Sequence, residues 1–267
     1  MKYKLIALDL DGTLKTSKNE ISPRTKAALM KAQEMGCHIV LASGRPTPGL
    51  RHDSTALELD KHNGYLLSYN GARVLNATTK ETIYAQTLDY EAAKAVIKKA
   101  KWFKLDINTY TDDYVICENK DAKYVKLEAD LIDLPFDEVA DISEALPNPL
   151  YKLLLSEEPE YAGSVVGELA RTFPGLSVYR SAPFFIECMA NGIDKANSLQ
   201  KLCDHLGITK DEVMAFGDGY NDMSMIDFAG LGVAMGNAVD EVKDKADIIT
   251  KSNDEDGIAV VLEKFLF

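Results

Sequence analysis

Two pairs of acidic residues follow short apolar segments at distant points of the chain. Asp9 and Asp11 stand two residues apart, and Asp218 and Asp222 stand four apart. Two carboxylates about 4 Å apart repel each other by roughly 4 kcal/mol at an effective dielectric of 20, so they need a cation, a shared proton or exposure to solvent. If the apolar segments are neighbouring strands, all four acids converge, and oxygen ligands of this kind suit Mg²⁺. For the first pair, a solvated Asp-Gly turn is the alternative.

A phosphate group fits beside such a cation if the chain supplies donors and positive charge. Ser43 and the Gly44 amide follow another apolar segment, and Asn221 lies between the two acids of the second pair. Lys195, at the start of a predicted helix, is the candidate cation, although a lysine there is by itself more typical of an exposed surface. Arg45 is a weaker candidate for additional charge. The sequence therefore predicts a site for a metal ion and a phosphate.

The elements that must position these residues alternate between strand and helix. The predicted strands are 5–8, 38–42, 65–68, 213–216, 232–235 and 247–250. Ser22-Pro23 is typical of a helix start and Gly36 of a helix end, and further helices are expected at 194–206, 220–228 and 257–265. Thr209–Glu212 has the spacing of a capping box. This alternation predicts an α/β fold with a parallel sheet, in which ligands bind beyond the carboxyl ends of the strands.

The pattern changes after about Thr87 and returns after Cys188. Predicted helices at 91–101 and 160–172 are mixed there with predicted strands at 107–111, 114–118, 151–156, 176–180 and 184–188. Hairpins mixed with helices indicate an α+β module. We therefore expect a discontinuous α/β core domain, residues 1–86 and 189–267, with an inserted domain at 87–188.

Composition excludes several classes of protein. The chain has 30 basic and 42 acidic residues, a formal net charge of −12, which argues against general binding to nucleic acid or to an anionic membrane. Its four cysteines have neither disulfide-framework nor zinc-site spacing. The apolar run near the start is too short for a signal peptide, and no run approaches the roughly 20 residues of a membrane span. We expect a soluble, cytoplasmic protein with a small-molecule partner; the sequence does not indicate the oligomeric state.

Taken in order, these motifs resemble those of the haloacid dehalogenase (HAD) superfamily phosphatases, in particular the Cof-like branch. The run from Asp9 to Leu14 resembles the first motif, Ser43-Gly44-Arg45 the second and Lys195 the third. Residues 217–222, continuing to 230–238, resemble the fourth, and the segments 70–72 and 253–257 also resemble this branch. The chain departs from the pattern at Ala196, where the branch usually has glycine.

The resemblance implies a Rossmann-like HAD core with a large inserted α/β cap. It also implies Mg²⁺-dependent hydrolysis of small phosphorylated metabolites, sugar phosphates above all. Asp9 would attack phosphorus and form an aspartyl-phosphate, and Asp11 would act as general acid and then as general base. The implied metal ligands are Asp9, the Asp11 carbonyl and Asp218. The implied phosphate-binding residues are Leu10, Ser43, Gly44, Lys195 and Asn221, with Asp222 orienting Lys195 or metal-bound water. The candidate cap residues for contact with the leaving group are Tyr110, Tyr114, Tyr179, Arg180 and Phe184; for each of them, a place in the core or on the surface of the cap is the alternative.

Three other functions are compatible with parts of the pattern. A phosphotransferase or mutase would use the same core chemistry. A non-catalytic regulator that binds a phosphorylated metabolite would not need both Asp9 and Asp11. A nucleotide-cofactor enzyme is disfavoured because the glycines at 230–236 follow a predicted helix, whereas the dinucleotide fingerprint requires a strand, a glycine turn and then a helix.

Overall fold

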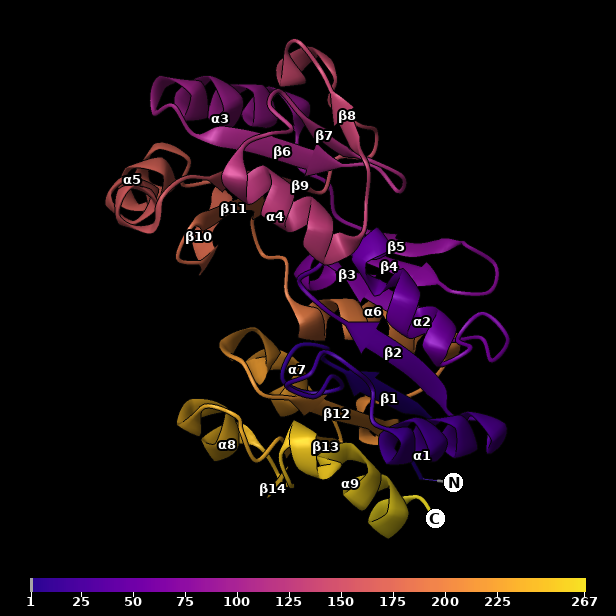
Figure 1. Ribbon diagram of the computed structural model, residues 1–267. Coiled ribbons are helices and arrows are strands. Elements are labelled where there is room, and N and C mark those ends of the chain that lie inside the picture. Colours follow the sequence, from indigo (N-terminus) through magenta and orange to yellow (C-terminus); the bar gives the residue numbers. More distant parts are fainter. Residues whose placement is uncertain (1) are drawn as a thin grey trace. The chain divides into compact units, whose positions relative to one another are not determined.

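The computed structural model describes residues 2–267, and close contacts divide the chain into two compact units (Figure 1). The first unit contains the chain through Ala85 and again from Asp194 to Phe267, and the second contains Gln86–Ile193. Each unit has its own sheet and its own buried apolar core. The chain therefore leaves the first unit once and returns to it once.

The first unit is an α/β fold. Its strands are β1 (Leu5–Leu8), β2 (His38–Ala42), β3 (Tyr65–Ser68), β4 (Arg73–Asn76), β5 (Thr82–Ala85), β12 (Val213–Gly217), β13 (Leu231–Ala234) and β14 (Ile248–Ile249). Its α-helices are α1 (Pro23–Glu34), α2 (Arg51–Ala56), α6 (Lys195–Leu206), α7 (Met223–Phe228), α8 (Asp240–Lys245) and α9 (Gly257–Phe265). Short 3₁₀ helices are η1 (Thr47–Leu50), η2 (Tyr69–Gly71), η4 (Lys210–Glu212), η5 (Tyr220–Asp222) and η6 (Asn253–Glu255).

The eight strands form one sheet in the order β14-β13-β12-β1-β2-β3-β4-β5. Neighbouring strands are parallel from β14 to β3, and β4 and β5 then continue the sheet antiparallel. Ile6 of β1 packs in the same apolar cluster as Leu29 of α1, and this cluster also contains residues of α9. Leu5 points to the opposite face and packs with Leu199 of α6. Both faces are covered by helices, which explains why the central strands are apolar throughout.

The parallel strands bring their carboxyl ends to one edge of the sheet, where the site residues lie. Leu8 at the end of β1 pairs with Leu41 of β2 on one side and with Phe216 of β12 on the other. Asp9, Ser43 and Asp218 are therefore the first residues after three adjacent strands. This arrangement follows directly from parallel pairing in register.

Local capping explains where the flanking helices begin. The Ser22 side chain accepts a hydrogen bond from the Thr25 backbone N–H, and Pro23 is the first helical residue of α1. Asp194 caps α6 in the same way, so that Lys195 is the first residue of that helix. The expected helix start at Ser22-Pro23 is confirmed, because a side-chain oxygen replaces the missing intrahelical acceptor there.

The second unit is an α+β fold. Its strands are β6 (Asp106–Tyr110), β7 (Val115–Cys117), β8 (Phe136–Glu138), β9 (Lys152–Ser156), β10 (Leu176–Ala182) and β11 (Phe185–Ala190), in the order β10-β11-β9-β6-β7-β8. Its helices are α3 (Tyr90–Trp102), α4 (Lys123–Ile132), the 3₁₀ helix η3 (Ile142–Glu144) and α5 (Pro159–Thr172). Residues of α3 and α5 pack on one sheet face in a single apolar cluster. On the other face, Tyr110 of β6 donates a hydrogen bond to Glu128 of α4.

The predicted fold class, a Rossmann-like parallel-sheet core with an inserted α+β domain, is confirmed. Several elements differ from the expectation. The sequence did not indicate β4, β5, β8, α2, α4 or α8, and the expected helix 220–228 is η5 followed by α7. The expected strand 247–250 is only two residues long in β14, and β11 continues to Ala190. Within residues 2–267, no helix is long and apolar enough to cross a membrane.

Candidate active site

Three acidic side chains meet at the carboxyl edge of the sheet in the first unit. Oxygens of Asp9, Asp218 and Asp222 all lie within 4.8 Å of one another. Asp9 follows β1. Asp218 and Asp222 follow the neighbouring strand β12, and Asp218 lies 209 residues after Asp9 in the chain. Asp9 and Asp222 are buried and Asp218 is half-buried. The structure thus brings together three of the four acids that the sequence singled out.

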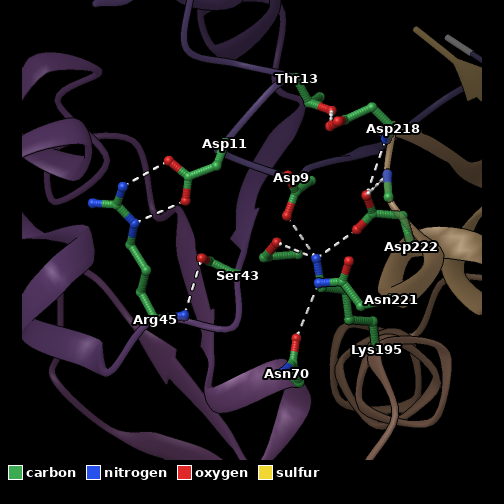
Figure 2. Close-up of polar contacts among 12 residues, drawn as sticks. Asp9, Asp11, Thr13, Ser43, Arg45, Asn70, Lys195, Asp218, Asn221 and Asp222 are labelled. Atoms are coloured by element: carbon green, nitrogen blue, oxygen red, sulfur yellow. Dashed lines mark hydrogen bonds and ion pairs between the residues drawn. The ribbon is translucent and has the colours of Figure 1, made fainter. Parts of the chain in front are cut away.

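Lys195 is the positive charge of this group (Figure 2). Its Nζ lies 2.7 Å from Asp9 Oδ1 and 2.6 Å from Asp222 Oδ1, and it donates a third hydrogen bond to the Ala42 carbonyl at 2.8 Å. The side chain is only 1% exposed. All three ammonium donors are therefore used inside the protein, and the surface alternative for this lysine is wrong. Ala196, which replaces the glycine of the family pattern, does not prevent the ammonium from reaching Asp9.

Asp222 anchors the loop after β12 as well as Lys195. Its Oδ2 accepts hydrogen bonds from the backbone N–H groups of Asp218 at 3.0 Å and Gly219 at 2.9 Å. The loop can close so tightly because residue 217 is glycine, where a Cβ would lie 2.4 Å from the Asp222 Cβ. Both oxygens of Asp222 are thus occupied, so its part in the group is to orient the ammonium and the loop.

Asp218 is fixed by a hydroxyl from the loop after β1. Thr13 Oγ1 donates a hydrogen bond to Asp218 Oδ1 at 2.6 Å. Gly12, between Asp11 and Thr13, has φ +86°, and a Cβ there would lie 2.3 Å from Asp218 Oδ2. Glycine is required on both counts, because it tolerates positive φ and has no side chain. The second carboxylate oxygen of Asp218 therefore lies directly beside the backbone that follows Asp9.

Burial changes the proton affinities of these groups. Burial raises the pKa of the Asp9 carboxyl above its usual range, Asp222 raises it further, and Lys195 opposes the rise. Burial also raises the pKa of Asp218 to about 6, against the hydrogen bond from Thr13. For Lys195, burial lowers the pKa, but the carboxylates of Asp222 and Asp9 outweigh this and raise it above its usual value. One ammonium is thus insufficient to neutralise the three acids, which is the electrostatic signature of a cation site.

The chemistry of the donors fits a hard divalent cation. Asp9 and Asp218 offer carboxylate oxygens at half-buried to buried positions, and the group contains no histidine or cysteine. A site with few carboxylates suits Mg²⁺, which keeps some of its water ligands. Asp222 is a weaker candidate as a ligand, since Lys195 and two backbone N–H groups already use its oxygens.

The predicted phosphate-binding residues lie around the same edge. Ser43 follows β2 and is buried, and its Oγ accepts a hydrogen bond from the Arg45 backbone N–H at 3.1 Å. Gly44 faces the Asn70 side chain, which a Cβ at Gly44 would approach to 3.1 Å. Asn221 is exposed and donates its side-chain amide hydrogen to Asn70 Oδ1 at 3.1 Å. Leu10 is fully buried, and its carbonyl accepts hydrogen bonds from the backbone N–H groups of residues 13 and 15.

Asp11 lies apart from the group, contrary to the expected convergence of four acids. Its carboxylate accepts hydrogen bonds from Arg45 Nε at 2.9 Å and from a terminal guanidinium nitrogen at 2.6 Å. Figure 2 shows Asp11 directed toward Arg45, while Asp9 and Asp222 are directed toward Lys195. The physical reason is charge: Arg45 neutralises a fourth carboxylate that would otherwise add to the repulsion among three.

The sequence analysis did not predict the contacts that three polar residues make in the site. Thr13 orients Asp218, Asn70 contacts Asn221, and Asn237 donates its side-chain amide to the Gly12 carbonyl at 2.8 Å. Each belongs to a segment that resembled the family, so the resemblance was the available signal. Their partners are distant in sequence, and local spacing could not have indicated them.

The aromatic and basic candidates in the second unit mostly have partners within that unit. Tyr110 is buried against Glu128, and the Tyr179 hydroxyl donates to Glu187 at 2.9 Å. Phe184 stacks on the Tyr124 ring with centroids 4.6 Å apart. Arg180 donates to backbone carbonyls of residues 159 and 183, and Tyr114 is exposed. The contacts of the first three stabilise the unit itself, and a role in substrate selection stays a prediction.

Fold and site together define a class of hydrolase, and comparison with known proteins agrees. A family model of haloacid dehalogenase-like hydrolases matches residues 6–262. The chain belongs to this family, and the predicted membership of the HAD superfamily, Cof-like branch, is confirmed.

Individual relatives extend over the whole chain. YxeH of Bacillus subtilis (strain 168) is 32% identical over 268 residues, which cover 99% of this chain and 98% of that protein. A B. subtilis protein named 5-amino-6-(5-phospho-D-ribitylamino)uracil phosphatase YcsE is 29% identical, with coverage of 98% and 96%. A haloacid dehalogenase-like hydrolase from Bacteroides thetaiotaomicron is similar in structure, with TM-score 0.96, 44% identity and coverage of 99% and 100%. A structure described as a HAD subclass IIB sugar phosphatase has TM-score 0.80, 28% identity and coverage of 98% of both chains.

Proposed function

We propose that this protein is a Mg²⁺-dependent phosphatase that hydrolyses monoesters of small phosphorylated metabolites through a phosphorylated Asp9. One observation carries the proposal: a buried lysine, Lys195, contacts Asp9 and Asp222 at 2.7 and 2.6 Å, with Asp218 beside them. Such a site combines a carboxylate nucleophile, a fixed ammonium and oxygen ligands for a cation. The phosphatase names of relatives that match along their full length support the same conclusion.

In this scheme Asp9 is the nucleophile. Lys195 binds Oδ1, so we assign the attack to Oδ2, which forms a bond to phosphorus as the bond to the leaving oxygen breaks. Lys195, Ser43, the Gly44 amide and Asn221 bind the oxygens of the transferring group, with the Leu10 backbone beside them. Asp9, Asp218 and the Asp11 carbonyl would hold a Mg²⁺ ion, whose positive charge would let a carboxylate approach a phosphate dianion.

Asp11 is assigned the proton transfers. It donates a proton to the leaving oxygen in the first step, and it accepts a proton from the water that attacks the phosphoryl group on Asp9 in the second. Its carboxylate is more than half exposed, so it can meet both an alcohol and a water molecule. The second step restores the Asp9 carboxylate and releases inorganic phosphate, so the reaction balances as ester plus water giving alcohol plus phosphate.

We infer that sugar phosphates and related polyol phosphates are the substrate class. The observation behind this is that two full-length relatives are named for such compounds, one for a sugar phosphate and one for a phosphorylated ribityl compound. The inserted unit would then select among them, with Tyr114, Arg180 and the other predicted cap residues as candidates.

A panel of phosphorylated metabolites tests the proposal. Purified protein is treated with a chelator, Mg²⁺ is restored, and release of inorganic phosphate is measured for each compound. We expect release only with Mg²⁺ and none from a folded Asp9→Asn variant. Phosphate release that persists in excess chelator, or in Asp9→Asn, would contradict the proposal. Formation of an isomeric phosphosugar without release of phosphate would instead support a mutase.

A further inference from the structure

The guanidinium of Arg45 makes a two-point contact with one of the proposed reacting groups. Arg45 Nε and a terminal nitrogen donate to the two oxygens of Asp11 at 2.9 and 2.6 Å. The arginine side chain is 20% exposed and that of Asp11 is 56% exposed. A fork of this kind makes two parallel hydrogen bonds and so fixes the direction of a carboxylate. The Asp11 side chain is therefore held in one orientation although its surroundings are open.

The backbone that carries Asp11 is braced separately. Lys15, four residues further on, forms an ion pair with Asp53 of α2 at 3.3 Å, and both side chains are buried. Asn237 and Asn253 donate side-chain hydrogen bonds to the carbonyls of Gly12 and Lys15 at 2.8 Å. These contacts fix the loop after β1 without Arg45. What Arg45 adds is the orientation of the Asp11 carboxylate.

Arg45 has two possible roles in the proposed reaction. As a cation near the site it could bind the transferring phosphoryl group, in the same manner as Lys195. Alternatively it could serve Asp11 alone. The distances favour the second, because the fork is directed at Asp11, while the carboxylates of Asp9 and Asp222 are directed at Lys195 (Figure 2).

We propose that Arg45 is a positioning residue for Asp11: it holds the carboxylate at a fixed place outside the Lys195 group, from which Asp11 reaches the leaving oxygen and then the attacking water. This inference rests on the proposed function. It assigns to Arg45 no contact with the phosphoryl oxygens, so removing Arg45 should weaken proton transfer and leave phosphate binding intact.

Leaving-group dependence separates the two roles. An alkyl phosphate such as a sugar phosphate needs a proton on its leaving oxygen, whereas p-nitrophenyl phosphate leaves without much assistance. Because general acid–base catalysis contributes about 10²–10⁴-fold, we expect Arg45→Gln to lower kcat/KM, which reports only the transfer to Asp9, by about 10–100-fold on the alkyl ester and by less than about 3-fold on the aryl ester. The inhibition constant of inorganic phosphate should stay within about twofold. Arg45→Lys, which keeps the charge but not the fork, should lie between Arg45→Gln and the unmodified protein.

Two further variants make the test decisive. Arg24→Gln removes a similar fork, from Arg24 to Glu263 at 3.1 and 2.7 Å, between two residues that make no contact with Asp11 in the fork described above, and should leave both activities unchanged. In an Asp11→Asn background, Arg45→Gln should cause no further loss on the alkyl ester, since the residue it positions is already disabled.

Equal losses on both esters with weaker phosphate inhibition would overturn the inference in favour of phosphate binding, and so would full activity of Arg45→Gln on the alkyl ester. If Arg45→Gln does not fold, the same ratio of losses is measured with Arg45→Lys, and an unchanged ratio there would also overturn it. Failure of the proposed function is distinguishable, because the unmodified protein would then release phosphate from neither ester.

Discussion

Each unit of this protein contains a buried lysine that forms an ion pair with one or more acidic side chains. The two units differ in how the negative charge of their buried acids is compensated. In the first unit Lys195 contacts Asp9 and Asp222, and Asp218 lies beside them. In the second unit Lys152 forms an ion pair with one oxygen of Glu187 at 3.0 Å, and the other oxygen of Glu187 accepts a hydrogen bond from the Tyr179 hydroxyl. The first cluster gathers three acids within 4.8 Å of one another, whereas in the second unit Glu128 and Glu187 each accept a hydrogen bond from a tyrosine hydroxyl.

The difference teaches how to distinguish a site from a structural ion pair. The second buried acid of the inserted unit, Glu128, accepts a hydrogen bond from Tyr110 at 2.8 Å. A hydroxyl donor satisfies a carboxylate without any additional ion. In the first unit the acids outnumber the single ammonium, and burial raises the pKa of Asp9 and of Asp218. Buried acids that the chain does not neutralise with its own basic residues indicate a place where a cation and a charged substrate can bind.

The largest expected effect is on Lys195. Lys195→Met removes the ammonium that orients Asp9 and faces the phosphoryl group, and positive groups of this kind contribute about 10³–10⁵-fold to phosphoryl transfer. We expect phosphate release to fall by at least about 10³-fold while the folded far-ultraviolet circular dichroism spectrum is kept. Lys201→Met, an exposed position on the same helix, is the matched control. A Lys195→Met variant with more than a tenth of the original activity would contradict the assignment.

The corresponding pair in the inserted unit should be replaceable by apolar residues. Lys152→Met leaves Glu187 buried without its ion pair, which costs about 3–5 kcal/mol in the free energy of unfolding. Adding Glu187→Leu should recover most of that loss, because a buried ion pair can be exchanged for well-packed apolar side chains. Urea denaturation measures both variants. If the double variant stays as unstable as the single one, the Lys152–Glu187 pair cannot be replaced by apolar residues, and the prediction is wrong.

Mg²⁺ should stabilise the protein in a pH-dependent manner. Asp218 has a pKa raised to about 6 in the folded protein and Asp9 is also raised, so without a cation the folded state binds more protons than the unfolded chain from about pH 4 upward. Stability from these groups is therefore greatest at low pH and falls as pH rises through about 6. A cation competes with those protons, and the stabilisation by Mg²⁺ should grow from pH 5 to pH 7.5.

At 100 times its Kd, the cation should add about 2.7 kcal/mol. Thermal denaturation with and without Mg²⁺ at each pH measures the effect. Asp218→Asn should abolish the shift and Lys152→Met should leave it unchanged. A shift that is independent of pH, or one that survives in Asp218→Asn, would place the cation elsewhere.

The smallest effect concerns the neutral donors of the inserted unit. Tyr110→Phe removes the hydroxyl that satisfies Glu128, and an unsatisfied buried acceptor costs about 1–3 kcal/mol. Tyr114→Phe, at an exposed position, should change stability by less than about 0.5 kcal/mol. Chemical denaturation compares the two, and equal effects would show that the hydroxyl is not needed.

Much of the site was predictable because strand ends are visible in the sequence. Apolar runs indicate parallel strands, and parallel strands bring their carboxyl ends together. Asp9, Ser43 and Asp218 could therefore be placed at one edge. Lys195 was proposed from its place at the start of a predicted helix and then matched a motif of the family, but that place does not by itself show that the side chain is buried.

Other features could not be predicted because they depend on side-chain direction. The fork from Arg45 to Asp11 joins residues 34 apart, and nothing in the local spacing shows that Asp11 points away from Asp9. The helices α2 and α8 are six residues each, too short for a clear periodicity, and their stability comes from packing. The helix α4 of the inserted unit begins at Lys123, and the residue before it, Ala122, has no side chain that could cap the helix, so the usual start signal is absent.

The central claim is that Asp9 is phosphorylated during the reaction, and direct trapping tests it. The protein is mixed with Mg²⁺ and a ³²P-labelled sugar phosphate, quenched in acid, reduced with borohydride and digested for mass spectrometry. We expect radioactivity to stay with the protein in acid, and the borohydride product to map to residue 9. A labelled or reduced residue at any other position would contradict the account. So would phosphate release with no trapped phosphoryl group when Asp11→Asn is given ³²P-labelled p-nitrophenyl phosphate, because that leaving group needs no proton and only the second step is then slowed.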